Sequence, residues 1–143
     1  MVKKLVIGFS LGFSLFAGAI WAQERSVWDG VFTAEQATRG DGLYQQRCAS
    51  CHGTSLSGGE SAPALTGGEF SSGWNGLTVG DLFERIRTTM PADRPGSVSR
   101  TQNADILSYI LKVNQFPAGA SELPTQTEVL KQIKLETEKP AKK

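Results

Sequence analysis

The 143-residue sequence predicts an all-α domain. Three segments begin with the N-cap and N3 residues of a capping box, and apolar residues at helical spacing follow two of them. No segment alternates apolar and polar residues over a length that would make a useful strand. Stretches rich in glycine, serine and proline separate the helical segments and are typical of loops. We therefore expect helices joined by irregular loops.

The first expected helix runs from Thr33 to about Arg47. Thr33 is the N-cap of a capping box, and Gln36 is its N3 residue. Gly40 and Gly42 lie inside this helix, where each costs about 1 kcal/mol of helix propensity. We expect a packing reason for both, because glycine lets another helix approach the backbone closely.

A long loop is expected next, from Gly53 to Gly76. It is rich in glycine and serine and is interrupted by Pro63. Long loops in compact domains usually have a function, so we expect this one to wrap a ligand. The second helix begins at the N-cap Thr78, with Asp81 at N3, and reaches about Thr89.

A proline-containing loop over residues 90–98 ends the second helix. The third helix opens with a capping box of Ser99 and Gln102, carries apolar residues at helical spacing and ends near Asn114. A short helix from Glu128 to Ile133 is the last expected element.

The N-terminus has the features of a secretory signal peptide over residues 1–22. Lys3 and Lys4 precede eighteen uncharged residues, Leu5 to Ala22, with small residues near the end. Cleavage after Ala22 would leave the rest of the chain exported, which in a bacterial cell means periplasmic. The alternative is an uncleaved membrane anchor, because eighteen apolar residues lie near the lower limit for spanning a bilayer.

The remaining length suggests a single domain. We expect an N-terminal extension over residues 23–32, the folded domain over residues 33–117, and a C-terminal extension over residues 118–143 with the short helix and a lysine-rich tail. Residues 23–130 carry a net charge of −4, whereas the tail from Lys131 carries +3. No basic stripe runs through the folded part, so nucleic-acid binding is not indicated. The tail is typical of a solvated, mobile terminus.

The chemistry of the chain is concentrated in the pentapeptide Cys48-Ala49-Ser50-Cys51-His52. It contains both cysteines and the one histidine of the whole sequence. C-x-x-C-H is the attachment motif of c-type haem. The two thiols bond to the vinyl groups of the haem, and the imidazole becomes an axial ligand of the iron. The motif therefore predicts one covalently bound haem, and the export signal agrees with it.

Three other interpretations of the motif are weaker. A redox-active C-x-x-C pair of the thioredoxin type expects alternating strands and helices around it, whereas a helix precedes this motif and a loop follows. A structural zinc site normally has four Cys or His ligands, and the chain offers three. A disulfide between Cys48 and Cys51 would close too small a ring to stabilise the fold much.

Met90 is the candidate for the second axial ligand of the iron. No second histidine exists, and Met1 leaves with the signal peptide. Met90 follows a helix, precedes Pro91 and lies 38 residues after His52, which is enough chain to circle a haem. The alternative is a methionine that only fills the core. A second strong ligand restricts the iron to electron transfer, whereas an open position allows small-ligand or peroxide chemistry.

These motifs together resemble class I monohaem cytochrome c. The matching stretches occur in the family's order between residues 31 and 114: Arg39-Gly40-Asp41-Gly42-Leu43-Tyr44, Cys48-Ala49-Ser50-Cys51-His52-Gly53, Ala62-Pro63-Ala64-Leu65, Thr89-Met90-Pro91 and Ala104-Asp105-Ile106-Leu107-Ser108-Tyr109-Ile110. The resemblance implies the cytochrome c fold, with three to four main helices wrapped around one covalently attached haem.

The resemblance also implies particular contacts. The N- and C-terminal helices would cross at right angles near Gly40, with Tyr44 and Tyr109 as partners in the crossing. The Pro63 carbonyl would accept a hydrogen bond from the free ring nitrogen of His52, which fixes the orientation of the imidazole.

The sequence therefore predicts a periplasmic electron-transfer protein, not an enzyme by itself, that cycles one haem between Fe(III) and Fe(II). Residues 86–97 are similar to cytochrome c domains associated with quinoprotein (PQQ-type) dehydrogenases. This similarity implies such a dehydrogenase as electron donor, with another cytochrome or a terminal oxidase as acceptor. The alternatives are a haem-binding subunit of a larger complex and, if Met90 is not on the iron, a haem protein that reacts with small ligands or peroxide.

Two further residues are candidates for contact with the haem propionates. Arg94 lies beside the Met90 loop and could pair with a propionate, and Trp74 could donate its indole N–H to one. The alternatives are a solvent-facing arginine and a core tryptophan.

Overall fold

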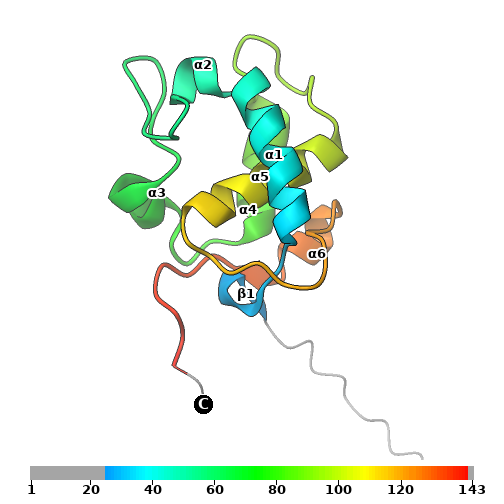
Figure 1. Cartoon of the computed structure of the whole chain (residues 1–143). Helices are drawn as coiled ribbons and strands as arrows, with labels where there is room; N and C mark the ends of the chain where they lie inside the picture. The colour runs from blue at the N-terminus through cyan, green and yellow to red at the C-terminus, as the bar shows by residue number, and fades with distance from the viewer. Residues whose placement is uncertain (1–24, 142–143) are drawn as a thin grey trace, which may run out of the picture.

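The computed structural model describes residues 25–141, which form a predominantly helical fold (Figure 1). Within this range it contains six α-helices: α1 (Ala34–Arg47), α2 (Ala49–His52), α3 (Gly67–Trp74), α4 (Val79–Thr89), α5 (Arg100–Val113) and α6 (Thr127–Leu130). A 3-10 turn, η1, covers Val27–Asp29. Two short strands, β1 (Arg25–Ser26) and β2 (Ile133–Lys134), pair in parallel. The all-α prediction is confirmed.

The predicted signal peptide, residues 1–22, lies outside the described residues. None of the helices in residues 25–141 has the length and hydrophobicity that crossing a bilayer requires.

Two main helices begin with complete capping boxes, as predicted. At the start of α4 the Thr78 side chain accepts a hydrogen bond from the Asp81 N–H, and the Asp81 carboxylate accepts one from the Thr78 N–H. Ser99 and Gln102 exchange the equivalent pair of bonds at the start of α5. These caps satisfy backbone N–H groups that have no partner inside the helix.

The capping box predicted for α1 is only half made. The Thr33 hydroxyl accepts a hydrogen bond from the Gln36 N–H at 3.1 Å. The buried Gln36 side chain, however, bonds the backbone of Leu123 instead of the cap: its Nε2 donates to the Leu123 carbonyl at 3.1 Å, and its Oε1 accepts from the Leu123 N–H at 2.6 Å. Gln36 therefore ties α1 to a segment 87 residues later.

α1 crosses α5, and this contact is the centre of the fold (Figure 1). A Cβ on Gly40 would lie 1.9 Å from the Asp105 carbonyl oxygen, so the packing reason expected for Gly40 is confirmed. A Cβ on Gly42 would meet nothing within 4 Å, so the same expectation for Gly42 is wrong. The Tyr44 and Tyr109 rings meet beside the crossing, with centroids 5.4 Å apart.

Two expectations about secondary structure are corrected. The loop expected over residues 53–76 contains helix α3, whose glycines and serines give little helix propensity. Burial of Phe70 and its contact with the Trp74 ring, at 6.4 Å between centroids, hold this helix through packing instead. The last helix ends at Leu130, and Ile133 belongs to β2.

Residues 25–33, before α1, and the residues after α5 pack against the central helices. Residues 118–137, which we call the C-terminal strap, run from orange to red beneath α5 and beside β1 in Figure 1. The buried apolar side chains of these two segments are Val27, Val31, Phe32, Leu123, Leu130, Ile133 and Leu135. The Trp28 indole donates to the Glu136 carbonyl at 3.0 Å, and the Thr137 N–H donates to the Asn75 side chain at 3.0 Å. The strap therefore shares one core with the helices.

Candidate haem site

A cavity of about 750 Å³ opens beside α2. Its volume lies in the range of roughly 300–1,000 Å³ that is usual for ligand and cofactor sites. The five residues predicted for the site all line it: Cys48, Cys51, His52, Pro63 and Met90. Apolar side chains from α3, α4, α5 and the loop before α3 form much of the wall: Leu65, Phe70, Trp74, Leu82, Ile86, Ile106 and Ile110.

The two thiols are presented by one helical turn. The N–H groups of Cys51 and His52 both donate to the Cys48 carbonyl, at 3.1 and 3.0 Å. Residues three apart in such a turn lie on the same face, so both thiols reach one edge of the cavity. Cys51 is exposed, whereas burial raises the pKa of the Cys48 thiol to about 11.

The imidazole of His52 is buried and held in a fixed orientation. Its Nδ1 lies 2.8 Å from the Pro63 carbonyl oxygen, which is the contact that the family resemblance implies. Because a carbonyl only accepts hydrogen bonds, Nδ1 carries the proton and Nε2 keeps its lone pair for a metal. The backbone around His52 is fixed as well: the Tyr44 hydroxyl donates to the Gly53 carbonyl at 2.7 Å, and the Gly58 N–H donates to the His52 carbonyl at 2.8 Å.

Met90 is placed by the end of α4. It is the C-cap residue of this helix, and its N–H donates to the Ile86 carbonyl at 2.9 Å. Met90 lines the same cavity as His52, although the two residues are 38 positions apart.

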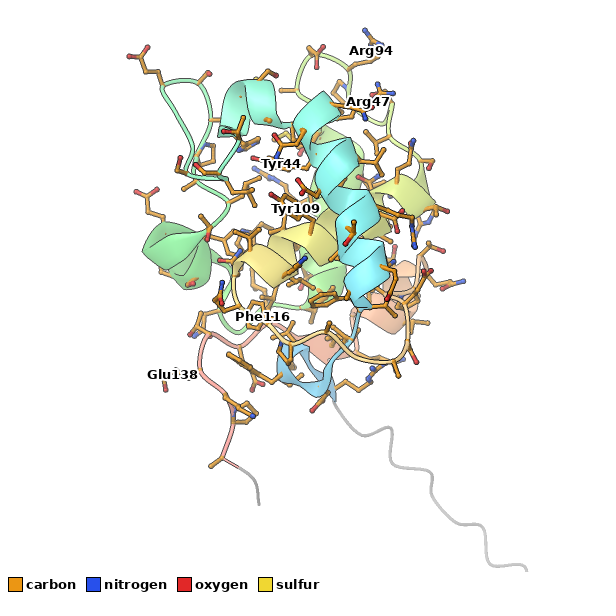
Figure 2. All side chains as sticks on the ribbon, viewed as in Figure 1. Tyr44, Arg47, Arg94, Tyr109, Phe116 and Glu138 are labelled. Atoms are coloured by element: carbon orange, nitrogen blue, oxygen red, sulfur yellow. The ribbon has the colours of Figure 1, made fainter. Side chains whose placement is uncertain are left out.

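Three arginines around the cavity have no carboxylate partner within salt-bridge distance among the described residues: Arg47, Arg85 and Arg94. Figure 2 shows Arg47 and Arg94 at the same end of the molecule. By contrast, Arg39, Arg87 and Arg100 are paired with carboxylates away from the cavity. The indole of Trp74 also borders the cavity. These groups are cations or N–H donors, and both kinds of group can bind the propionate carboxylates of a haem.

The donor set fits a covalently attached haem. Two thiols share one edge, an oriented imidazole and a thioether face the same space, and apolar walls suit a flat apolar ring. Sequence reasoning missed that Arg85 and the wall residues of α3 and α5, such as Phe70 and Ile106, line the cavity. Nothing in the sequence indicates this position, because only the packing of the helices brings these side chains to the cavity.

Comparison with known proteins identifies the family. Residues 35–110 match the family model described as cytochrome c oxidase, cbb3-type, subunit III. The chain is also 42% identical over 88 residues to cytochrome c-551 of Bacillus subtilis (strain 168), a match that covers 61% of this chain and 76% of the relative. The chain belongs to the cytochrome c family. It is a class I monohaem c-type cytochrome, and the covalent haem c predicted from Cys48, Cys51 and His52 is confirmed.

A solved structure shares the fold of this cytochrome. It is the crystal structure of the sulfane dehydrogenase SoxCD from Paracoccus pantotrophus, with a TM-score of 0.50 and 21% sequence identity. The match covers 76% of this chain, and the chain spans 61% of that structure's chain. At this identity the similarity concerns the fold alone, and with the family match it confirms the predicted cytochrome c fold.

Proposed function

We propose that this cytochrome is an exported electron carrier whose haem iron is held by His52 and Met90. A cytochrome c domain carries out haem-based electron transfer. The observation that supports this ligand pair is the convergence of the two side chains on one cavity, with the His52 ring already oriented by the Pro63 carbonyl. Once attached, the haem supplies a one-electron Fe(III)/Fe(II) couple.

The residues of this chain favour that role in two ways. One hydrogen bond holds the His52 ring and another holds the backbone of Met90, so little rearrangement would accompany a change of iron charge. The apolar wall, including Leu82 and Ile106, excludes water and raises the reduction potential, as does a thioether ligand in place of a second nitrogen. Redox partners would reach the haem edge near Cys51, the exposed cysteine, through a small and transient docking surface.

The absorption spectrum of the ferric protein tests the proposed ligand pair. Methionine-ligated ferric haem has a weak band at the red end of the spectrum, and we expect Met90→Ala to abolish it and to lower the reduction potential. Leu82→Ala removes another cavity side chain that cannot bind iron and should retain the band. Identical high-spin spectra for the wild type and Met90→Ala would refute the ligand pair and favour small-ligand or peroxide chemistry instead.

The proposed donor is a quinoprotein dehydrogenase, and the proposed location is the periplasm. The donor rests on the similarity of residues 86–97 to cytochrome c domains associated with such enzymes, and the location rests on residues 1–22. Stopped-flow mixing should show saturable reduction of the ferric protein by a purified quinoprotein dehydrogenase with its substrate. Reduction by ascorbate but not by that enzyme would refute the donor. Mass spectrometry of the periplasmic fraction should find a mature chain that begins at Gln23.

A further inference from the structure

The loop that carries Met90 is held together at its base by a cluster of side chains outside the cavity. α4 ends one residue before Met90, and α5 begins at Arg100, after the loop over residues 90–98. The Glu84 carboxylate on α4 lies 3.8 Å from Nη1 of Arg100 on α5. The Arg100 guanidinium also lies over the Phe83 ring of α4, 5.1 Å from its centroid. These contacts tie the two helices to each other across the base of the loop.

The C-terminal strap completes this cluster. Thr127, the first residue of α6, donates its hydroxyl hydrogen to the Glu84 carboxylate and accepts a hydrogen bond from Nη2 of Arg100 at 2.8 Å. Arg100 also donates to the Thr125 carbonyl from Nε and Nη2, at 3.0 and 2.7 Å. One threonine side chain is thus bonded to both helices that flank the Met90 loop.

The C-terminal strap also packs directly against α4. Leu130 of α6 is fully buried. A Cβ on Gly80 would lie 2.6 Å from the backbone nitrogen of Lys131, so the backbones of α4 and the end of α6 are in direct contact. The strap therefore touches α4 at two levels, at Gly80 near its start and at Glu84 near its middle.

We propose that Thr127, Glu84 and Arg100 are positioning residues for Met90, which fix α4 against α5 and so hold the thioether in the cavity. The proposal rests on the axial role proposed for Met90. None of the three residues lines the cavity, so their influence on the iron passes through the helix backbones. We call these three residues the clamp. Thr127 lies beyond residues 35–110, the part that matches the family model, so the clamp depends on a segment outside that match.

Competition between Met90 and added imidazole in the ferric haem-loaded protein tests the clamp. Loss of the weak red band reports displacement of the thioether. We expect imidazole to displace it at about fivefold lower concentration in Thr127→Val and in Glu84→Gln, because one or more of the bonds that hold α4 in place is lost. Glu122→Gln is the matched control, because Glu122 lies in the strap and its ion pair with Arg39, at 2.7 Å, involves neither α4 nor α5. Its imidazole affinity should stay within about twofold of the wild type.

The free energy of unfolding, measured for the same variants, separates positioning from general destabilisation. Imidazole binding that tightens in all three variants in proportion to lost stability would overturn the clamp. So would wild-type imidazole affinity in Thr127→Val and Glu84→Gln, and in that case the axial role of Met90 would stand as long as the wild type shows the red band. Absence of the band in the wild type would refute the axial role and the clamp together.

Discussion

Gly40→Ala and Gly42→Ala should change the stability of this cytochrome in opposite directions, although the two glycines lie two residues apart in α1. A Cβ at Gly40 would stand 1.9 Å from the Asp105 carbonyl oxygen and 2.5 Å from its carbonyl carbon. A Cβ at Gly42 would meet nothing within 4 Å, and Gly42 is exposed. The two substitutions therefore add the same methyl group to the same helix in opposite surroundings.

The expected magnitudes follow from two effects. Alanine in place of glycine inside a helix contributes about 1 kcal/mol at either position. At Gly40 the added methyl meets backbone atoms of Asp105, which cannot rotate away as a side chain would, so α1 and α5 must separate. Overpacking of this kind costs up to about 3 kcal/mol. We expect a net loss of about 2 kcal/mol for Gly40→Ala and a gain of 0.5 to about 1 kcal/mol for Gly42→Ala.

Guanidinium unfolding of the haem-loaded proteins, followed by far-ultraviolet circular dichroism, measures both effects. The midpoints should move in opposite directions at unchanged slope, because the surface exposed on unfolding stays the same. In thermal scans a change of 1 kcal/mol corresponds to about 4 °C for a domain of this size. Gly40→Ala as stable as the wild type, or both variants shifted in one direction, would refute the close approach of α1 and α5 at Gly40.

Three further predictions concern hydrogen-bonded side chains. The pKa of Glu84 is lowered from 4.5 to about 2, chiefly by its bond with Arg87, so the ionised group stabilises the fold above about pH 4.5 and this contribution is lost as the pH falls through about 2. Since its side chain is 29% exposed, solvent screening limits the effect to about 1 kcal/mol. Urea unfolding should show Glu84→Gln less stable than the wild type by that amount at pH 7, and the difference should vanish as the pH falls below about 2. Gln36→Leu leaves the N–H and carbonyl of Leu123 buried and unpaired, and urea unfolding should show a loss of about 2–4 kcal/mol. Tyr44→Phe removes the bond donated by its buried hydroxyl and should lower the free energy of unfolding by about 1 kcal/mol in the same assay, whereas an unchanged value would show that the hydroxyl does not stabilise the turn after the haem motif.

The sequence predicted those parts of the fold whose signals are local. α4 and α5 begin at capping boxes because the cap and the N3 residue are three positions apart, whatever the rest of the chain does. α3 was missed because Gly67, Gly68 and Gly73 argue against a helix, and its helical state depends on packing of Phe70 and Trp74. Propensity is a weak guide wherever tertiary contacts decide.

The same distinction holds for the site. Cys48, Cys51 and His52 form a contiguous motif, and Met90 follows by elimination because the chain offers one other methionine, in the predicted signal peptide. Arg85 could not be predicted in this way, because an arginine on an amphipathic helix usually faces solvent, and only the placement of α4 against the cavity brings it to the haem site.

The polar contacts of the C-terminal strap connect it to three elements that line the haem cavity, each on the side that faces away from the cavity. Gln36 and Arg39 bond the strap to α1, whose end presents Cys48. Asn75 bonds the strap next to Trp74, and Glu84 bonds it to the helix that ends before Met90. Three walls of the cavity are thus fixed on their outer side by one segment. Because the matched family domain ends at residue 110, the rigidity of those walls in this chain depends on residues beyond the part that defines the family.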